Sequence, residues 1–302
     1  MKNKPSGSPR CITRPRSSKF VDIFRTTPVE TVCPNFYVLA HATKCRFDPA
    51  CSYCYLKSSF GGRKTPEVFV NTDRMMEEVE AWIASDGLES YVLNTGNLSD
   101  SLIFEDVRPV MPELIDLFRR KAAGRPHTLL IVTKGGTKEC AFMIKAKPCA
   151  NVTISFSVNA PEAAAKFEAG APPSEDRLKA ARQLKKRGWR VRMRIDPMIL
   201  GYDYAWLIEQ VYALAPERLT IGTLRAERNL PRFAEDGLFD ALEPIQDNKK
   251  LARYPLDQRL AMYRQVVDRM KKICPIGLCE ETPNVWNALG LDTESKSCNC
   301  GG

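Results

Sequence analysis

The chain has 302 residues, of which 44% are hydrophobic and 27% charged, and its formal net charge is +9. A chain of this length can bury a full core, so it needs neither a disulfide nor a metal simply to fold. Its apolar runs are far shorter than the roughly 20 residues that cross a bilayer, and no apolar signal-peptide segment follows Met1. We therefore expect a soluble, cytoplasmic protein with no membrane partner.

The histidine and cysteine counts narrow the chemistry. His41 and His127 are the only two histidines, which argues against His-centred hydrolysis and against a His-rich metal site. The eleven cysteines are an odd number, in a chain with no mark of secretion. Under reducing conditions clustered cysteines indicate metal ligation or redox chemistry more often than disulfides.

The first predicted region is residues 1–34. It is rich in Ser, Pro, Arg and Lys and shows no sustained apolar period. Residues 1–30 contain seven basic and two acidic side chains, a net charge of +5. We interpret residues 1–34 as a basic, flexible N-terminal arm.

The second predicted region, residues 35–248, alternates between strand-like and helix-like segments. The predicted strands are residues 35–41, 90–95, 128–133, 152–158, 191–199 and 218–224. The predicted helices are residues 73–84, 108–121, 138–144, 174–187 and 204–214, with Ser174 as a helix N-cap and Gly188 as a helix stop. Strand–helix alternation predicts a parallel sheet flanked by helices, as an open sheet or a barrel.

The third predicted region, residues 249–302, contains a long helix at 256–273 and then a cysteine-bearing tail. In either parallel architecture the functional site lies at the C-terminal ends of the strands. The loops after the predicted strands are therefore where functional residues are expected.

Three cysteines, Cys45, Cys51 and Cys54, lie within ten residues on the loop after the first predicted strand. Their thiolates could hold three irons of a [4Fe–4S] cluster and leave one iron open to a small molecule. Alternatively, they could bind a structural zinc with Cys33 as the fourth ligand. The aromatic residue Tyr53 and the position after the first strand favour the iron–sulfur cluster.

With these motifs the sequence resembles the radical S-adenosylmethionine (SAM) superfamily and, within it, the spore photoproduct lyase family. The resemblance covers about residues 35–300, and it implies a partial (β/α)6 barrel of the radical SAM type with a C-terminal helical, Cys-bearing extension. The matching segments are Cys54–Leu56, Thr133–Gly135, Phe156–Asn159, Phe167–Gly170, Arg177, Asp196–Ile199, Gly222–Arg225, Leu278–Trp286 and Cys298–Cys300.

The resemblance also implies the cofactors and their ligands. Cys45, Cys51 and Cys54 would hold a [4Fe–4S] cluster whose open iron binds SAM, and reductive cleavage of SAM would give a 5′-deoxyadenosyl radical. An external one-electron donor such as flavodoxin or ferredoxin would reduce the cluster. The cofactor-binding residues implied in this way are Tyr53, Asn94, Thr95, Gly96, Ser99, Lys134 and Ser157.

Two departures from the family pattern bear on the reaction. Five residues separate Cys45 from Cys51, where the usual first gap has three. Alignment of Ser99 with the family's Thr-Ser-Asp run places Asn97 where spore photoproduct lyases carry a hydrogen-donating cysteine. An amide cannot donate a hydrogen atom to a carbon radical as a thiol can, so either another residue does so or the reaction differs.

The candidate catalytic residues are therefore Tyr55, Asn97 and three cysteines of the C-terminal tail. Tyr55 matches a tyrosine that the family uses in radical relay. Cys279, Cys298 and Cys300 could bring a thiol to the site, could bind a second metal together with Cys274, or could belong to a purely structural tail. Cys140 and Cys149 are expected to pack in the core.

The resembled family acts on thymine in DNA, which implies DNA as the partner. Residues 177–194 contain nine basic and no acidic side chains, a pattern typical of a polyanion-binding surface. Tyr202 and Tyr204 could stack on an extruded base. Trp206 could do the same, but its helical spacing favours a place in the core.

Three hypotheses follow. The first is a radical SAM enzyme that acts on a thymine-type base in DNA, as in photoproduct repair. The second is a radical SAM enzyme of lyase or isomerase type that rearranges or modifies a hypermodified thymine or another nucleic-acid base, which Asn97 favours. The third is a non-catalytic, metal-stabilised nucleic-acid-binding protein.

Overall fold

A parallel sheet forms the centre of the computed structural model, which describes residues 11–25, 27–60, 65–234, 237–245, 251–295 and 297–301. Within these ranges the main sheet has eight strands. In spatial order they are β13 (Ile276–Leu278), β10 (Leu219–Thr223), β9 (Arg190–Met198), β8 (Val152–Val158), β7 (Thr128–Thr133), β6 (Val92–Asn94), β3 (Phe36–Leu39) and β2 (Val21–Phe24). All neighbouring pairs are parallel except β2 and β3.

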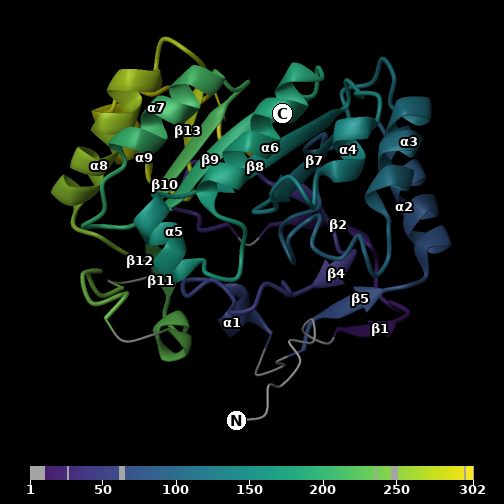
Figure 1. Cartoon of the computed structure of the whole chain (residues 1–302), viewed down its shortest axis with the longest axis horizontal. Helices are drawn as coiled ribbons and strands as arrows, with labels where there is room; N and C mark the ends of the chain where they lie inside the picture. The colour runs from purple at the N-terminus through teal and green to yellow at the C-terminus, as the bar shows by residue number, and fades with distance from the viewer. Residues whose placement is uncertain are drawn as a thin grey trace.

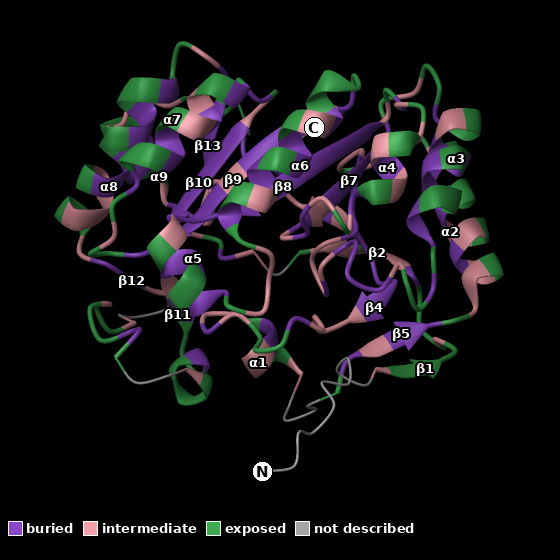
Figure 2. Cartoon of the chain, in the orientation of Figure 1, coloured by how far each residue is buried: buried purple, intermediate pink, exposed green. Residues whose placement is uncertain are grey.

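Helices cover one face and both sides of this sheet (Figure 1). They are α2 (Thr72–Ala84), α3 (Met111–Lys121), α4 (Ala141–Lys145), α5 (Pro161–Phe167), α6 (Ser174–Lys186), α7 (Ala205–Leu214), α8 (Leu256–Met270) and α9 (Pro283–Ala288). Every residue of β8 is buried, as is typical of parallel strands packed on both faces. The helices turn their buried residues toward the sheet and their exposed residues outward (Figure 2).

The six predicted strands correspond to β3, β6, β7, β8, β9 and β10, which lie side by side in chain order. The bounds of β7 and β8 agree with the prediction at both ends. The predicted α/β class with a parallel sheet is thus confirmed. The described strands leave the sheet open, with β2 at one edge and β13 at the other.

Residues 11–25 differ from the predicted flexible arm, whose first ten residues lie outside the described ranges. β1 (Ile12–Arg14) pairs with β5 (Glu67–Phe69), which also pairs with β4 (Ala42–Thr43), and β2 extends the main sheet. Phe20 is fully buried, and its backbone N–H donates to the Glu78 carboxylate at 2.6 Å. The burial of Phe20 and the pairing of β1 and β2 with neighbouring strands hold this segment in place. Neither feature gives the sequence an apolar period.

The ends of α6 test two local predictions. Ser174 is the first residue of the helix rather than its N-cap, because its hydroxyl donates to the carbonyl of Asn159 at 2.7 Å. The prediction of Ser174 as the N-cap is therefore wrong, and Pro173 takes that position. Gly188 follows the helix with φ of +93°, the left-handed backbone at which helices commonly end, so the predicted stop is confirmed.

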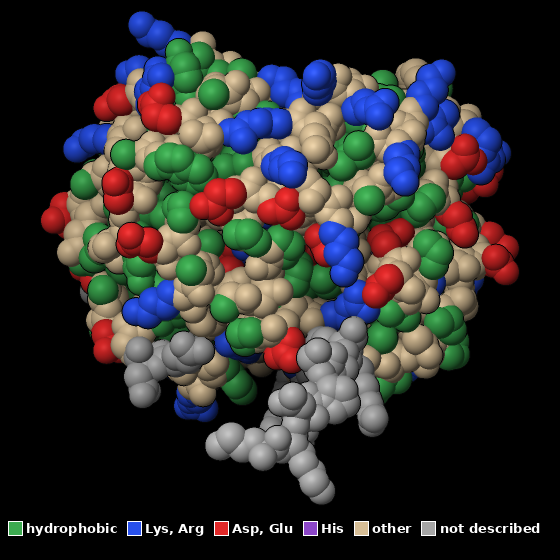
Figure 3. Space-filling model, viewed as in Figure 1, with side chains coloured by type: hydrophobic (Ala, Val, Ile, Leu, Met, Phe, Trp, Pro, Cys, Tyr) green, Lys and Arg blue, Asp and Glu red, His purple; other side chains and the backbone are tan. Residues whose placement is uncertain are grey.

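The basic run 177–194 does not form one surface. Arg177 lies on the buried face of α6. Arg192 and Arg194 are alternate residues of β9, and they project toward the side of the sheet on which the C-terminal tail lies. The basic residues of α6 that remain exposed are Lys179, Arg182, Lys185, Lys186 and Arg187. Figure 3 shows basic side chains over the face that α6 occupies in Figure 1, on the outside of the sheet.

The C-terminal tail packs against β9, β10 and β13. The Arg192 guanidinium donates to the carbonyls of Asn299 and Gly301 at 3.0 and 3.2 Å, and Arg218 donates to the carbonyl of Cys298 at 2.9 Å. A Cβ on Gly277 would lie 2.2 Å from the backbone nitrogen of Cys298. The tail therefore follows β13 at backbone contact distance.

We expect Gly277→Ala to displace this tail, at a cost of about 1–3 kcal/mol in the free energy of unfolding. Urea unfolding measures that cost, and Ellman's reagent measures the exposure of the Cys298 thiol, which is 5% exposed in the native chain. Faster thiol labelling under native conditions is the expected result. Labelling at the rate of an Asn284→Ala control would show that the tail is not held by this contact.

No helix within the described ranges combines the length and apolar character needed to span a membrane.

Candidate functional site

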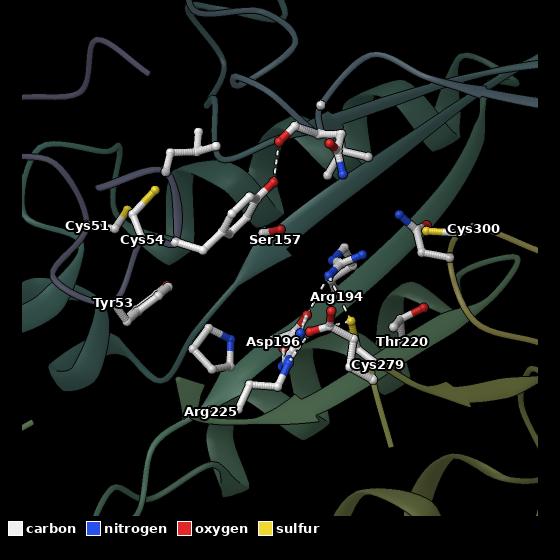
Figure 4. A pocket seen from close by; sticks show the side chains of 18 of the residues that line it. Cys51, Tyr53, Cys54, Ser157, Arg194, Asp196, Thr220, Arg225, Cys279 and Cys300 are labelled. Carbon is white, nitrogen blue, oxygen red and sulfur yellow. Dashed lines mark hydrogen bonds and ion pairs between the residues drawn. The ribbon is translucent and has the colours of Figure 1, made fainter. Parts of the chain in front are cut away.

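A cavity of about 660 Å³ opens at the C-terminal ends of the strands. Apart from Thr95, every candidate catalytic, cofactor-binding and cluster-ligating residue lines it, although these residues come from six separate segments. They are Cys45, Cys51, Tyr53, Cys54, Tyr55, Asn94, Gly96, Asn97, Ser99, Lys134, Ser157, Cys279, Cys298 and Cys300. The structure thus brings the cysteine loop and the C-terminal tail to one chamber, as Figure 4 shows.

The cysteine loop is held from two sides. The backbone N–H of Ser52 donates to the carbonyl of Phe167 at 2.8 Å, and Ser99 donates from its hydroxyl to the carbonyl of Lys44 at 2.7 Å. Gly170 lies against the loop so closely that a Cβ there would be 2.2 Å from the carbonyl oxygen of Pro49. The end of α5 and the loop after β6 together fix the path of the cysteines.

The three loop cysteines fit an iron–sulfur centre by their chemistry. All three are free and half-buried, and burial raises the pKa of each thiol, to about 12 for Cys51. A bound metal cation reverses this shift because it stabilises the thiolate. Within the described ranges no three His, Cys, Asp or Glu side chains form a group with metal-site geometry.

Tyr53 and Lys134 are oriented by a buried carboxylate, Glu168. The Tyr53 hydroxyl donates to Glu168, the Arg177 guanidinium forms an ion pair with it, and Lys134 Nζ lies 3.9 Å from its Oε1. Asn159 adds a hydrogen bond of 3.3 Å. Burial alone would raise the pKa of Glu168, but Lys134 and Arg177 outweigh burial and hold that pKa below its ordinary value.

Glu168 was not among the candidate site residues, although the matching segment 167–170 contains it. We expect Glu168→Gln to destabilise the fold by about 3–5 kcal/mol, because it leaves the fully buried Arg177 without a charge partner. The folded pKa of Glu168 is below its ordinary 4.5, so its contribution is present above that pH and lost as the pH falls through the folded pKa. Urea unfolding from pH 3 to pH 7 should therefore show a flatter profile for Glu168→Gln. A parallel profile would contradict this assignment.

Some residues of the loop after β6 face the cavity, and others face the core. Asn94 accepts the backbone N–H of Gly96 through its side-chain oxygen at 2.8 Å, and both residues line the cavity. Thr95 points the other way, with its hydroxyl 2.7 Å from that of Ser101 and 3.1 Å from the carbonyl of Leu130. The prediction that Thr95 contacts a cofactor is therefore not supported, because its hydroxyl is committed within the core.

Asn97 contacts Tyr55 through its backbone carbonyl and not through its side-chain amide. The Tyr55 hydroxyl donates to the backbone carbonyl of Asn97, and both residues line the cavity. Tyr55 is 43% exposed.

The far side of the cavity holds charged residues that the sequence reading did not assign to the site. Asp196 accepts hydrogen bonds from Arg194 and, at 2.7 Å, from Arg225. The Cys279 sulfur lies 3.1 Å from Nη2 of Arg225 and 3.5 Å from Nη2 of Arg194. Burial opposes ionisation of Asp196, yet the two arginines hold its pKa well below the usual range. The segments 196–199 and 222–225, which carry the family resemblance, were the signal for this group.

Several other histidine and cysteine residues have structural roles or lie in the core. His41 is buried, with Nε2 3.0 Å from the carbonyl of Thr95 and Nδ1 3.2 Å from Arg108, and burial lowers its pKa to about 3. Cys140 and Cys149 are buried in the core, as predicted. Cys274 also lies in the core and away from the cavity, whereas Cys33 lines it.

The aromatic residues after β9 do not form a stacking surface. Tyr204 is buried, with its hydroxyl 2.8 Å from Oδ1 of Asn159, and Tyr202 packs edge-on against Phe167. Trp206 is 40% exposed on α7, so the prediction that it belongs to the core is wrong.

Comparison with known proteins identifies the family. The family model described as spore photoproduct lyase matches residues 13–224, more than two thirds of the chain. The chain belongs to the spore photoproduct lyase family. This confirms the resemblance to that family and to the radical SAM superfamily that contains it.

Two curated spore photoproduct lyases share limited identity with the chain. The protein of Bacillus subtilis (strain 168) is 23% identical over 207 residues, which are 67% of this chain and 58% of the relative. The protein of Geobacillus sp. (strain Y412MC61) is 25% identical over 184 residues, which are 61% of this chain and 52% of the relative. The chain thus spans little more than half the length of the spore photoproduct lyases it matches.

Solved structures of spore photoproduct lyase share the fold. A complex with dinucleoside spore photoproduct has a TM-score of 0.69 at 17% identity and covers 89% of this chain and 81% of that one. A mutant with bound AdoMet and dinucleoside spore photoproduct has a TM-score of 0.66 at 18% identity, with 90% and 81% covered. The open sheet described above is therefore the partial barrel that the resemblance implied.

Proposed function

We propose that this chain is a radical SAM enzyme that acts on a thymine-type base in DNA. The observation that carries the proposal is the meeting of three loop cysteines, a set of polar strand-end residues and a radical-relay tyrosine in one cavity of a spore photoproduct lyase family member. The cofactors are a [4Fe–4S] cluster on Cys45, Cys51 and Cys54, and SAM. An electron-transfer protein such as flavodoxin or ferredoxin is the proposed donor.

When bound, the cluster and SAM would supply a 5′-deoxyadenosyl radical, and the residues of the cavity would hold SAM in place. Tyr53, fixed by its hydrogen bond to Glu168, offers a flat apolar surface for the adenine. Lys134 can pair with the carboxylate of the methionyl group, and Gly96 lets the loop after β6 pack against β7, because a Cβ there would lie 2.5 Å from Cβ of Val132. Ser157 and Asn94 supply further polar contacts from neighbouring strands.

The proposed substrate rests on the family. Two solved family structures hold dinucleoside spore photoproduct, a thymine-derived lesion, over the same fold. The cavity of about 660 Å³ is in the range of pockets that enclose small ligands. The exposed basic residues of α6 lie outside the cavity, so we do not assign them to base recognition.

A second candidate is modification or rearrangement of a hypermodified thymine or another nucleic-acid base. Asn97 favours it, since the family's hydrogen-donating thiol is replaced there by a residue whose carbonyl already accepts from Tyr55. Isomerase chemistry would need no such thiol at that position.

Product analysis by mass spectrometry separates the two candidates. The cluster-loaded protein is incubated with SAM, dithionite and ultraviolet-irradiated DNA, and separately with DNA that carries 5-substituted thymine. Loss of photoproduct with restored thymine supports repair. Intact photoproduct with a changed 5-substituted base supports modification. If neither DNA changes and SAM is not cleaved, the chain is a metal-stabilised nucleic-acid-binding protein instead.

A further inference from the structure

The cavity contains a thiol that is placed by charged side chains rather than by metal-site geometry. Cys279 follows β13, and its backbone N–H donates to the carbonyl of Ile221 at 2.8 Å, which fixes it at the C-terminal end of β10. Glu280 then turns the chain with φ of +51°. This arrangement leaves the Cys279 side chain half-buried at the cavity wall.

Three charged side chains surround the sulfur. Nη2 of Arg225 and Nη2 of Arg194 lie 3.1 and 3.5 Å from Sγ, and both guanidinium groups also donate to the carboxylate of Asp196. Figure 4 shows Cys279 beside Asp196 and Arg194, on the other side of the cavity from Cys51 and Cys54.

The other thiols of the cavity lack this setting. Cys298 is only 5% exposed, and its carbonyl accepts the backbone N–H of Gly301 at 3.1 Å. Cys300 and Cys33 also line the cavity, but no guanidinium group donates to either sulfur among the hydrogen bonds of the described residues. Of these four described thiols, Cys279 alone combines access to the cavity with hydrogen bonds from two guanidinium groups.

We propose that Cys279 is the hydrogen-atom donor that ends the radical reaction. This inference rests on the proposed function. The hydrogen atom leaves Sγ with one electron of the S–H bond and joins the carbon-centred radical of the base, so that a C–H bond forms and Cys279 becomes a thiyl radical. One electron from the electron-transfer protein and one proton from solvent then restore the thiol.

The surroundings of Cys279 suit this role in two ways. Burial, followed by the charge of Asp196, raises the pKa of the Cys279 thiol well above its usual range, so the S–H hydrogen is retained at neutral pH. The S–H bond is weaker than the C–H bond that forms, which makes the transfer favourable. The thiol thus supplies, from the C-terminal segment, the chemistry that Asn97 cannot supply after β6.

Deuterium labelling tests the proposal, because the thiol hydrogen exchanges with solvent. Reactions run in D2O with SAM, dithionite and the two DNA substrates above yield two measured quantities, 5′-deoxyadenosine and deuterium in the base product. The native chain is expected to place one deuterium in each product molecule. In Cys279→Ser, whose hydroxyl keeps the hydrogen bonds but not the weak bond to hydrogen, product should fall roughly tenfold or more while 5′-deoxyadenosine stays within about twofold.

Two further variants make the outcome decisive. Cys11→Ser lies outside the cavity lining and should match the native chain in product and deuterium. Native product and deuterium in Cys279→Ser overturn the proposal, as does their loss in Cys300→Ser instead. Thermal unfolding of the metal-free Cys279→Ser protein should match that of the native chain, and a large drop would assign Cys279 a structural role. If the native chain cleaves no SAM or changes neither DNA, the proposed function fails and this inference with it.

Discussion

Cys51→Ala should abolish both cluster binding and SAM cleavage while the chain stays folded. Cys51 lies on a loop that is held by Ser52, Phe167 and Gly170 through backbone contacts, none of which involves the Cys51 side chain. Two remaining thiolates cannot hold a cluster that needs three protein ligands. Iron after anaerobic reconstitution should therefore fall from about four atoms per chain to near zero.

The control for this change is Cys11→Ala, which removes a half-buried thiol outside the cavity. It should retain native iron content, native 5′-deoxyadenosine formation and a native unfolding curve. If Cys51→Ala kept the cluster while a Cys33→Ala variant lost it, the ligand set assigned to the loop would be incorrect.

Gly170→Ala should displace the cysteine loop, although Gly170 lies 118 residues from Ser52 in the sequence. The added Cβ would lie 2.2 Å from the carbonyl oxygen of Pro49 and 2.6 Å from the backbone nitrogen of Asp48. Neither is a flexible side-chain end, so the loop must move or α5 must shift. Overpacking of this kind costs about 1–3 kcal/mol in the free energy of unfolding.

The functional loss from Gly170→Ala should exceed the loss of stability. We expect iron content and SAM cleavage to fall strongly at a temperature where circular dichroism shows a folded protein. Ala169→Ser, at an exposed neighbouring position, is the matched control and should leave all three measurements unchanged. Native iron uptake by Gly170→Ala would mean that α5 does not position the loop.

The alternation of side chains along strands explains two differences between the sequence predictions and the structure. Asn94 and Gly96 face the cavity, whereas Thr95 between them faces the core, as a period of two requires. The same period turns Arg192 and Arg194 inward from β9, which is why a run of basic residues is not a surface. Reading this period in the sequence would have corrected both predictions.

Other features depend on partners distant in sequence. Phe20 and Glu78 order β2, and no local pattern of residues 11–25 announces that pairing. The group around Asp196 needs Arg225 and Cys279, which come from different strands. Motif positions 196 and 225 could be recognised as important from the sequence, but their mutual contact could not, because it depends on how β9, β10 and β13 are aligned.

The cysteine loop was predictable because its chemistry is local. Cys45, Cys51 and Cys54 are close in sequence, and the loop follows the first of the parallel strands, where such folds place their sites. The C-terminal thiols were predictable only as candidates. Their separation into a half-buried Cys279 beside Asp196, a backbone-bonded Cys298 and a core Cys274 required the structure.

Reductive cleavage of SAM by the reconstituted chain is the most direct test of the proposed radical SAM activity. The protein is loaded anaerobically with iron and sulfide, mixed with SAM and dithionite, and assayed for bound metal and for 5′-deoxyadenosine. We predict about four irons per chain and formation of 5′-deoxyadenosine that depends on Cys51. One tightly bound zinc per chain, with no cleavage of SAM, would contradict it.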